Sequence, residues 1–408
     1  VLGNPPFLGK KEQSAAQKAD VEPLFKPMKG GGVLDFVAAW YVKAANYLKA
    51  AGAAQPRCAF VSTNSITQGE QVGILWSWLL AQGIHIHFAH RTFSWTNEAK
   101  GKAAVHCVII GFGLEGRPNK VIYEYEDIKG APHAVPANNI SPYLVDTPNC
   151  VLESRRTTVS PAPEMVKGNE ATDDGNLILN DSQLEALLAV EPKAGKWIRK
   201  FLGGENFLND GNRWCLWLQD IDPQELRAMP EVMKKIDSVR KFRLASPKAA
   251  TVEKARQPWL FGEIRQPSGE NVIVVPKVSS ERRVYLPIGF EPASTILNNT
   301  LQFVPNGSLF HFGVLQSQMH AAWMRATAGR MKSDYQYSIS IVYNNFPWPE
   351  LPKNESKTAV AGVSIAYLAI ENAAKTVLDE RAKHQAGDNP ASLADLYDPL
   401  TMPPALLK

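Results

Sequence analysis

Cysteine is scarce in this 408-residue sequence, and its few positions exclude two kinds of small-domain framework. The four cysteines stand far apart and form no C-x-x-C pair; they are Cys58, Cys107, Cys150 and Cys215. Structural zinc sites and disulfide-stapled folds both need paired or closely spaced cysteines, so neither is expected. The pattern fits a protein of the reducing cytoplasm.

Long apolar runs are also absent. No segment approaches the roughly 20 apolar residues of a membrane-spanning helix, and the first residues lack the charged start and apolar core of a signal peptide. We therefore expect no membrane partner. With 45% hydrophobic and 21% charged residues, the chain can bury a sizeable core and is expected to form two or three domains.

The net charge is small, at +4, but one stretch concentrates it. Residues 234–283 contain twelve basic residues against five acidic ones. This excess indicates a polyanionic partner, and an ordinary solvated surface is the alternative. The candidate phosphate contacts in this stretch are Arg240, Lys241, Arg243, Arg282 and Arg283.

The first 148 residues alternate strand and helix patterns. Val1 to Gly3 has the pattern of a strand end, because Asn4-Pro5 cannot continue a hydrogen-bonded ladder. Apolar spacing predicts helices over 33–50 and 70–81, and β-branched runs predict strands over 58–62, 84–89, 104–112 and 121–125. The order predicts a parallel α/β sheet closed at one edge by the later strands, with its earlier strands upstream of Val1.

The composition changes at about residue 149 to Pro-, Asp- and Asn-rich segments with short elements. This change predicts a separate α+β domain over 149–345, with helices over 182–190, 224–243 and 315–330. Two prolines within 344–349 end regular structure. Apolar spacing over 358–384 predicts a long helix in a C-terminal helical segment, 346–408.

Asn4-Pro5-Pro6-Phe7, at the end of the first strand, suits methyl transfer to an exocyclic amine. The amine lone pair is delocalised into the base, so the enzyme must hold both N–H groups with acceptors that favour a tetrahedral nitrogen. Asn4 and the Pro5 carbonyl are candidate acceptors in a loop stiffened by proline. Phe7 is a candidate to stack on a base flipped out of the duplex. The alternative is a plain turn.

This loop, GNPPFLGKK at 3–11, resembles the catalytic loop of MmeI-like type IIL and IIG restriction–modification enzymes, which are DNA adenine-N6 methyltransferases. Other stretches resemble signatures of the same family and follow in the same order along essentially the whole chain. They are FSWTNEA at 93–99, RWCLWL at 213–218, GRMKSD at 329–334 and NNFPWP at 344–349.

The resemblance implies that residues 1–148 are the C-terminal part of a methyltransferase domain. Its sheet would be an incomplete class I S-adenosylmethionine-dependent (Rossmann-like) sheet, followed by a target recognition domain. In that family a nuclease domain and the cofactor-binding strands precede the Asn-Pro-Pro loop, and this sequence does not contain them. It is therefore expected to be inactive alone. S-adenosylmethionine is the implied methyl donor, double-stranded DNA the implied partner, and no metal is expected.

The resemblance also implies roles for individual residues near the catalytic loop. Phe93 or Trp95 resembles the aromatic residue that faces Phe7 across the flipped base. We favour Phe93, with core packing as the alternative. Lys10 and Lys11 are candidates to hold phosphates beside the flipped nucleotide, with a solvated loop as the alternative.

Base recognition is predicted in the block that begins at Arg330, itself a candidate phosphate contact. Lys332, Asp334 and Gln336 alternate, so an extended segment would point all three side chains to one side. Lysine can donate to guanine, aspartate can accept from cytosine, and glutamine can pair with adenine in the major groove. The alternative is a solvated strand or turn.

Two patterns carry less weight. GFGLEG at 111–116 matches G-x-G-x-x-G, but no helix follows that could hold a phosphate, so a turn is predicted. His85, His87 and His90 lack a fourth ligand, so packing histidines are predicted instead of a metal site. Two other functions stay open: a DNA-binding specificity module without chemistry, and methylation of RNA or protein through the same loop.

Overall fold

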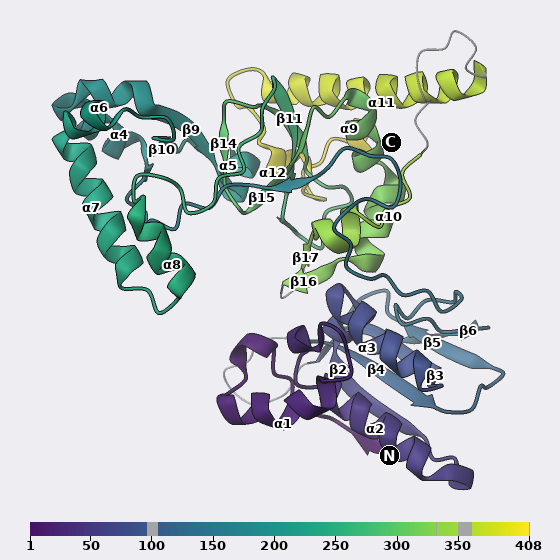
Figure 1. Ribbon diagram of the computed structural model, residues 1–408. Coiled ribbons are helices and arrows are strands. Elements are labelled where there is room, and N and C mark those ends of the chain that lie inside the picture. The colour runs from purple at the N-terminus through teal and green to yellow at the C-terminus, as the bar shows by residue number, and fades with distance from the viewer. Residues whose placement is uncertain (96–104, 332, 350–360, 408) are drawn as a thin grey trace. The chain divides into compact units, whose positions relative to one another are not determined.

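The computed structural model describes residues 1–95, 105–331, 333–349 and 361–407, and divides the chain into two compact units (Figure 1). Unit 1 comprises Val1–Thr157 and Trp323–Asn345, and unit 2 comprises Thr158–Ala322 and Phe346–Lys408. The chain returns to unit 1 within helix α10 (Gln318–Thr327). No helix in the described ranges has the length and apolar character needed to cross a bilayer.

Unit 1 is built on a six-stranded sheet in the order β1-β2-β4-β3-β5-β6. The strands are β1 (Leu2–Gly3), β2 (Cys58–Thr63), β3 (His85–Trp95), β4 (Val105–Gly113), β5 (Lys120–Glu124) and β6 (His133–Ala137). β1 is parallel to β2, and β3 is parallel to β5. β4 is antiparallel to both of its neighbours, and β6 is antiparallel to β5. The predicted strands and α/β class are confirmed, but the sheet is mixed instead of parallel.

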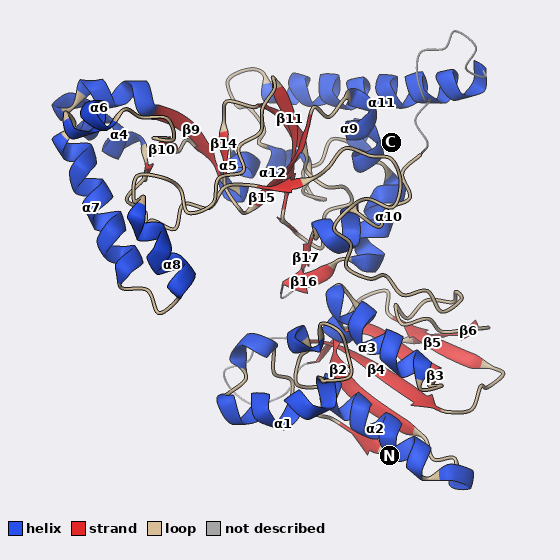
Figure 2. Ribbon diagram, viewed as in Figure 1, coloured by secondary structure: helices blue, strands red, loops and turns tan. Residues whose placement is uncertain are grey.

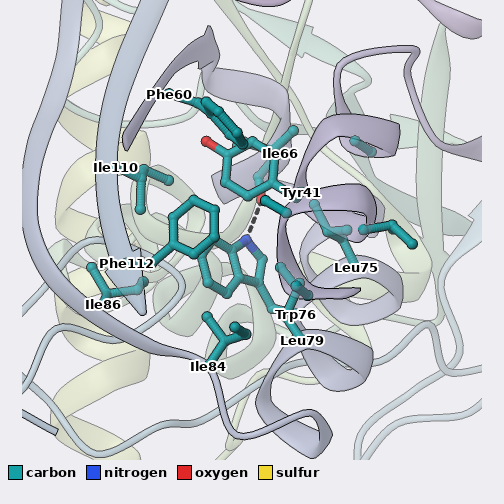
Figure 3. Packing of buried hydrophobic residues seen from close by; sticks show 14 of the residues in the cluster. Tyr41, Phe60, Ile66, Leu75, Trp76, Leu79, Ile84, Ile86, Ile110 and Phe112 are labelled. Atoms are coloured by element: carbon teal, nitrogen blue, oxygen red, sulfur yellow. Dashed lines mark hydrogen bonds between the residues drawn. The ribbon is translucent and has the colours of Figure 1, made fainter. Parts of the chain in front are cut away.

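Helices α2 (Ala38–Ala50) and α3 (Glu70–Ala81) lie side by side over one face of this sheet (Figure 2). Tyr41 of α2 stacks on Phe112 of β4, with ring centres 5.2 Å apart (Figure 3). The indole N–H of Trp76, on α3, donates to the carbonyl of Ile66 at 2.8 Å. These contacts bury the apolar sides of both helices, which is why their spacing was visible in the sequence.

The helix predicted over 70–81 is confirmed as α3, whereas the one predicted over 33–50 starts later, at Ala38, after a 3-10 turn. Helix α1 (Ala15–Phe25) was not predicted. It begins with a capping box, in which Ser14 and Gln17 bind each other's backbone N–H groups. Its buried residues are Val21 and Phe25, too few to give a clear helical pattern.

Unit 1 also contains an antiparallel hairpin made of β16 (Gly329–Met331) and β17 (Asp334–Gln336). A π-helical turn, Ile339–Tyr343, follows the hairpin. Asn345 then anchors this turn, because its Nδ2 donates to the carbonyls of Ser340 and Ile341.

Unit 2 contains two four-stranded sheets, with orders β14-β9-β10-β8 and β13-β11-β15-β7. Its strands are β7 (Val166–Lys167), β8 (Ile178–Leu179), β9 (Ile198–Leu202), β10 (Trp214–Leu216), β11 (Asn271–Pro276), β12 (Val278–Ser279), β13 (Gly289–Pro292), β14 (Ile296–Leu297) and β15 (Leu301–Pro305). Its remaining helices are α4 (Asp181–Val190), α5 (Gly204–Asn209), α6 (Pro223–Arg227), α7 (Pro230–Leu244), α8 (Ala249–Glu253), α9 (Leu309–Gln316), α11 (Ala361–Gln385), α12 (Leu393–Leu396) and α13 (Pro404–Leu407).

Two apolar clusters hold unit 2 together. One contains Phe201, Trp217 and Phe261, and the other surrounds Val272 and Phe303 in the second sheet. Helix α9 packs against the long helix α11, and Figure 1 shows the two helices next to each other. Residues 158–322, the part of unit 2 that lies within the predicted 149–345 domain, mix helices with short strands, as that α+β prediction expects.

Proline and short turns explain where the predicted helices of unit 2 differ from the structure. The helix predicted over 224–243 is divided into α6 and α7, because Pro230 lacks an N–H donor and starts a new helix. The segment predicted over 315–330 is likewise shared among the end of α9, all of α10 and the start of β16. The helix predicted over 182–190 is confirmed as α4, and the one predicted over 358–384 is confirmed as α11 from Ala361 on, since 358–360 lie outside the described residues.

Candidate functional site

The Asn4-Pro5-Pro6-Phe7 loop lies at the carboxyl edge of the unit 1 sheet. It follows β1 directly, and β1 is parallel to β2, with Gly3 paired to Phe60. Asn4 and Pro6 are exposed, Phe7 is half-buried and Pro5 is buried. Within the described residues, neither the Asn4 carboxamide nor the Pro5 carbonyl makes a hydrogen bond. Both remain candidate acceptors for a substrate.

Asp35 holds the chain that leaves this loop. Its Oδ1 accepts the backbone N–H of Lys10 at 3.0 Å. Its Oδ2 accepts from the Ser65 hydroxyl at 2.8 Å and from the Gln71 amide at 2.7 Å. Nearby, the N–H of Phe36 donates to the carbonyl of Leu8 at 2.9 Å. The loop is thus fixed at its exit by a carboxylate that bridges it to the turn after β2 and to α3.

Phe93 lies at the same edge of the sheet. β3 is antiparallel to β4, and Phe93 is paired with Cys107, which is also the partner of Thr63 at the end of β2. The half-buried Phe93 ring stacks on Tyr125, with centres 5.4 Å apart. Trp95 is the last residue of β3. The topology therefore brings the catalytic-loop candidate and Phe93 to one edge, with β2 and β4 between their strands.

The three histidines of β3 have separate environments. The His90 ring stacks on Tyr123 at 4.3 Å and its Nδ1 hydrogen-bonds the Tyr125 hydroxyl at 2.8 Å. Burial lowers the pKa of His90. His87 Nε2 instead meets the carbonyl of Glu115 at 2.8 Å. No group of three possible metal ligands was found in the described part of the chain.

The segment that follows Arg330 is a hairpin, not a single extended strand. Asp334 is paired with Met331, and Tyr335 with Arg330, so the chain reverses between β16 and β17. Asp334 and Gln336 are half-buried and point to one side of β17, while Tyr335 is buried on the other. Lys332 lies outside the described residues. The predicted alternation therefore holds for two of the three base-reading candidates.

The prediction that Arg243 contacts a DNA phosphate is wrong, because this side chain is buried. It is 1% exposed. Its five N–H donors reach five backbone carbonyls, those of Ala171, Thr172, Lys254, Gln257 and Leu260. Burial also lowers the pKa of this guanidinium. Arg243 therefore ties α7 to neighbouring loops and does not face solvent, where a phosphate would bind.

The other basic candidates lie nearer the surface. Lys10, Lys11, Arg240 and Lys241 are exposed, whereas Arg283 is half-buried. The exposed Arg282 forms an ion pair with Asp398 at 3.1 Å. Arg330 lies over the Tyr335 ring, with its guanidinium carbon 3.9 Å from the ring centre.

Sequence reasoning missed Asp35 and Gln71. These two side chains and the Lys10 backbone N–H that Asp35 binds come from separate parts of the sequence, and no spacing rule connects them. The turn predicted at 111–116 is confirmed, because β4 ends at Gly113 and the chain then enters β5 without a helix.

Comparisons with known proteins identify the family. Residues 1–124 match the model of the MmeI DNA-methyltransferase domain, 146–350 that of the MmeI target recognition domain, and 366–408 that of the MmeI C-terminal domain. DNA methyltransferase A of Bacillus subtilis (strain 168) is 39% identical over 407 residues, which are 99% of this chain and 43% of that protein.

A solved structure agrees with these matches. The type IIL restriction–modification enzyme MmeI, in complex with DNA, has 48% sequence identity and a TM-score of 0.90 over 100% of this chain and 52% of that one. The chain spans about half the length of both relatives. The order of the three domain models also agrees with the order of the sequence signatures. This chain belongs to the MmeI family of type IIL restriction–modification enzymes and carries its methyltransferase, target recognition and C-terminal domains.

Proposed function

We propose that this chain is the C-terminal part of a cytoplasmic enzyme that methylates the N6 amine of adenine at one DNA sequence. The observation that carries this proposal is the position of Asn4-Pro5-Pro6-Phe7. The loop follows β1 at the carboxyl edge of parallel strands, where α/β sheets bind ligands. Its two polar acceptors are uncommitted within the described residues.

The loop chemistry follows from these acceptors. Asn4 Oδ1 and the Pro5 carbonyl each accept a hydrogen bond from one N–H of the adenine amine, which favours a tetrahedral nitrogen whose lone pair is available to the methyl group. Pro5 and Pro6 restrict the backbone, so both acceptors are in place before the base arrives. The half-buried Phe7 stacks on the flipped base and offsets part of the cost of unstacking it.

S-adenosylmethionine supplies the methyl group when it is bound. The carboxyl edge suits a polar ligand, because Asn64, directly after β2, is 6% exposed and its Nδ2 has no hydrogen-bond partner in the described ranges. We infer that the rest of the cofactor site lies before Val1, on strands that complete a class I sheet. β1 is an edge strand, and its Leu2 is 87% exposed, which supports such a continuation.

DNA recognition is assigned to the β16–β17 hairpin and to basic surface residues. Asp334 and Gln336 read bases from one side of β17, together with Lys332. Phosphate contacts position the domain without reading sequence. The residues assigned to them are Lys10, Lys11, Arg240, Lys241, Arg282, Arg283 and Arg330.

The test uses the full-length protein with duplex DNA and S-adenosylmethionine, followed by mass spectrometry of the nucleosides. We expect N6-methyladenine at one sequence. Asn4→Ala is expected to lower the rate by about 10²–10³-fold, because one acceptor of the reacting amine is lost, while DNA affinity stays unchanged. Methylation of RNA or of cytosine, or an unchanged rate for Asn4→Ala, would contradict the proposal.

The second candidate is a DNA-binding specificity module without chemistry of its own. It is favoured by the coverage of only about half of either relative. Titrating the 408-residue chain with fluorescent duplex DNA at two salt concentrations, with and without S-adenosylmethionine, separates the two. Salt-sensitive binding that ignores the cofactor supports the module, whereas cofactor-dependent affinity means that the chain contains a working cofactor site.

A further inference from the structure

The start of helix α3 touches the base of the recognition hairpin. Gly69 caps this helix, and its N–H donates to the carbonyl of Thr327 at 3.1 Å. Thr327 ends α10, two residues before the hairpin begins. A Cβ atom on Gly69 would lie 3.0 Å from the Cα and 3.2 Å from the backbone N of Gly329. The hairpin base and the helix therefore meet backbone to backbone.

Gly69 also has a conformation that other residues avoid. Its φ is +64° and its ψ is −148°, a region open essentially to glycine alone. A side chain at this position would meet both backbone strain and a neighbour that cannot move cheaply.

The same turn of α3 holds the catalytic loop. Gln71 Nε2 donates to Asp35 Oδ2 at 2.7 Å, and the Asp35 N–H donates back to Gln71 Oε1 at 3.0 Å. Asp35 Oδ1 in turn accepts the N–H of Lys10, three residues after Phe7. One short path of contacts thus leads from the hairpin through α3 to the catalytic loop.

A third contact anchors the chain on the other side of the hairpin. A Cβ on Gly73 would lie 2.5 Å from the carbonyl oxygen of Leu152. The segment after Leu152 binds the end of the π-helical turn, because Asn345 Nδ2 donates to the Glu153 carbonyl at 3.0 Å and Asn344 Nδ2 to the Arg155 carbonyl at 2.8 Å. The hairpin is therefore tied to α3 both before and after its two strands.

We propose that the first turn of α3 sets the distance between the base pair that the hairpin reads and the adenine that the catalytic loop methylates. Gly69 and Gln71 are positioning residues in this arrangement. The inference rests on the proposed function. DNA fixes the spacing of the two bases, so the protein must match it, and a misplacement of about 1 Å can cost roughly 10²-fold in rate.

The first test is Gly69→Ala in the full-length enzyme. The added methyl group displaces the hairpin from α3. We expect kcat on the recognised site to fall about tenfold or more. KM for DNA stays within about threefold, because the phosphate contacts remain. We also expect less discrimination against duplexes with one altered base pair at the position read by the hairpin.

Gly52→Ala separates positioning from backbone strain. It carries a similar positive φ, +53°, but the added Cβ meets no atom of the described residues within 4 Å. This variant is expected to retain kcat and discrimination. If Gly69 has a merely structural role, Gly69→Ala and Gly52→Ala will both lower the melting temperature, and neither will lower kcat selectively relative to KM.

Gln71→Ala tests the contact between α3 and Asp35, and it keeps the proposal testable if Gly69→Ala does not fold. It removes both bonds to Asp35. We expect a lower kcat and weaker fluorescence from 2-aminopurine placed at the target adenine, which reports base flipping. Gln82→Ala is the matched control, because this glutamine directly follows α3 and its side-chain amide oxygen accepts a hydrogen bond from the Lys49 ammonium at 2.8 Å, away from Asp35.

The outcomes separate this inference from the proposed function. If Gly69→Ala and Gln71→Ala match their control variants in kcat, KM and discrimination, the positioning role is wrong while the enzyme remains an adenine methyltransferase. If the unchanged full-length enzyme forms no N6-methyladenine, the proposed function fails, and this inference fails with it.

Discussion

The guanidinium of Arg330 covers the ring of Tyr335, its direct cross-strand neighbour in the β16–β17 hairpin, at 3.9 Å from the ring centre. Arg330 Nη1 also donates to the carbonyl of Ser333 at 2.6 Å, next to the reversal of the chain. The Arg330–Tyr335 contact lies on the hairpin face opposite Asp334 and Gln336. Arg330 therefore stiffens the element on which the proposed base-reading residues stand.

We predict that Arg330→Ala loosens the hairpin locally. A half-buried cation–π pair contributes about 0.5–1 kcal/mol, so the backbone amides of β16 and β17 are expected to exchange with solvent about two- to fivefold faster. Arg330→Lys keeps the charge but loses the planar stack, so its amide exchange rates are expected to lie between those of the unchanged protein and of Arg330→Ala. Unchanged exchange in both variants would show that the stack adds nothing to the hairpin.

Arg240 and Arg243 on helix α7 are predicted to have opposite phenotypes. Arg243→Ala removes the donors of five carbonyls in a buried position, and we expect a loss of stability on the order of 3 kcal/mol. Arg240 is exposed, so Arg240→Ala should change the free energy of unfolding by less than about 0.5 kcal/mol. It should lower DNA affinity and reduce the slope of log affinity against log salt concentration by about 1, as expected for the loss of one phosphate contact. Equal DNA affinity for the Arg240→Ala variant and the unchanged protein would remove Arg240 from the DNA surface.

These two arginines show how much of the fold and site the sequence could predict. Helix α3 was predicted at its observed bounds, because its apolar spacing is a local pattern. Charge is also visible in sequence, but burial is not, so Arg243 was grouped with the surface cations. The Asp35 contacts to Lys10 and Gln71 join residues 25 and 36 positions apart, and only the folded chain brings them together.

The hairpin shows the same limit at shorter range. Alternating residues after Arg330 indicate an extended segment, but nothing in GRMKSD specifies that the chain reverses between Met331 and Asp334. The sequence between these two residues, Lys-Ser, lacks the Asn-Gly or Asp-Gly pair that marks hairpin turns. The hairpin is instead tied to α3 at Gly69, a contact about 260 positions away along the chain.

Exchanging Lys332 and Asp334 is predicted to change the recognised sequence. In Lys332→Asp with Asp334→Lys, a donor replaces an acceptor at Asp334, and we expect a different base pair to be preferred at one position. The change in discrimination should be about 1–3 kcal/mol, while the methylated base stays the same. Sequencing the methylated sites of the full-length enzyme measures both. A double variant that keeps the original site would show that these residues do not read it.

Stability of unit 2 is predicted to fall below neutral pH because of His320. This side chain is fully buried against Phe346, and burial lowers its pKa from 6.5 to about 3. Between these values the unfolded chain binds a proton that the folded chain does not, so stability decreases as pH falls below 6.5. The decrease from this residue should reach about 1.4 kcal/mol at pH 5.5.

His320→Leu removes this proton while filling a similar volume. We expect its melting temperature to change less between pH 7.5 and pH 5.5 than that of the unchanged protein, as measured by calorimetry. The exposed His384→Leu is the control and should keep the original dependence. Parallel pH profiles for His320→Leu and the unchanged protein would exclude His320 as the cause.

Phe93 is predicted to be a base-stacking residue, and its place in the sheet makes this testable against simple packing. β1 and β3 are separated by β2 and β4, so their backbones lie roughly 14 Å apart at about 4.8 Å per strand. This span can hold a base between Phe7 and Phe93.

The variant Phe93→Leu keeps apolar contact with Tyr125 but loses the stack. We expect kcat to fall by about tenfold or more, since base stacking contributes about 1–3 kcal/mol, with weaker 2-aminopurine fluorescence at the target. Tyr125→Leu removes the ring behind Phe93 and should have the smaller effect. A Phe93→Leu enzyme with an unchanged kcat would make Phe93 a packing residue, and the stacking role would then pass to Trp95.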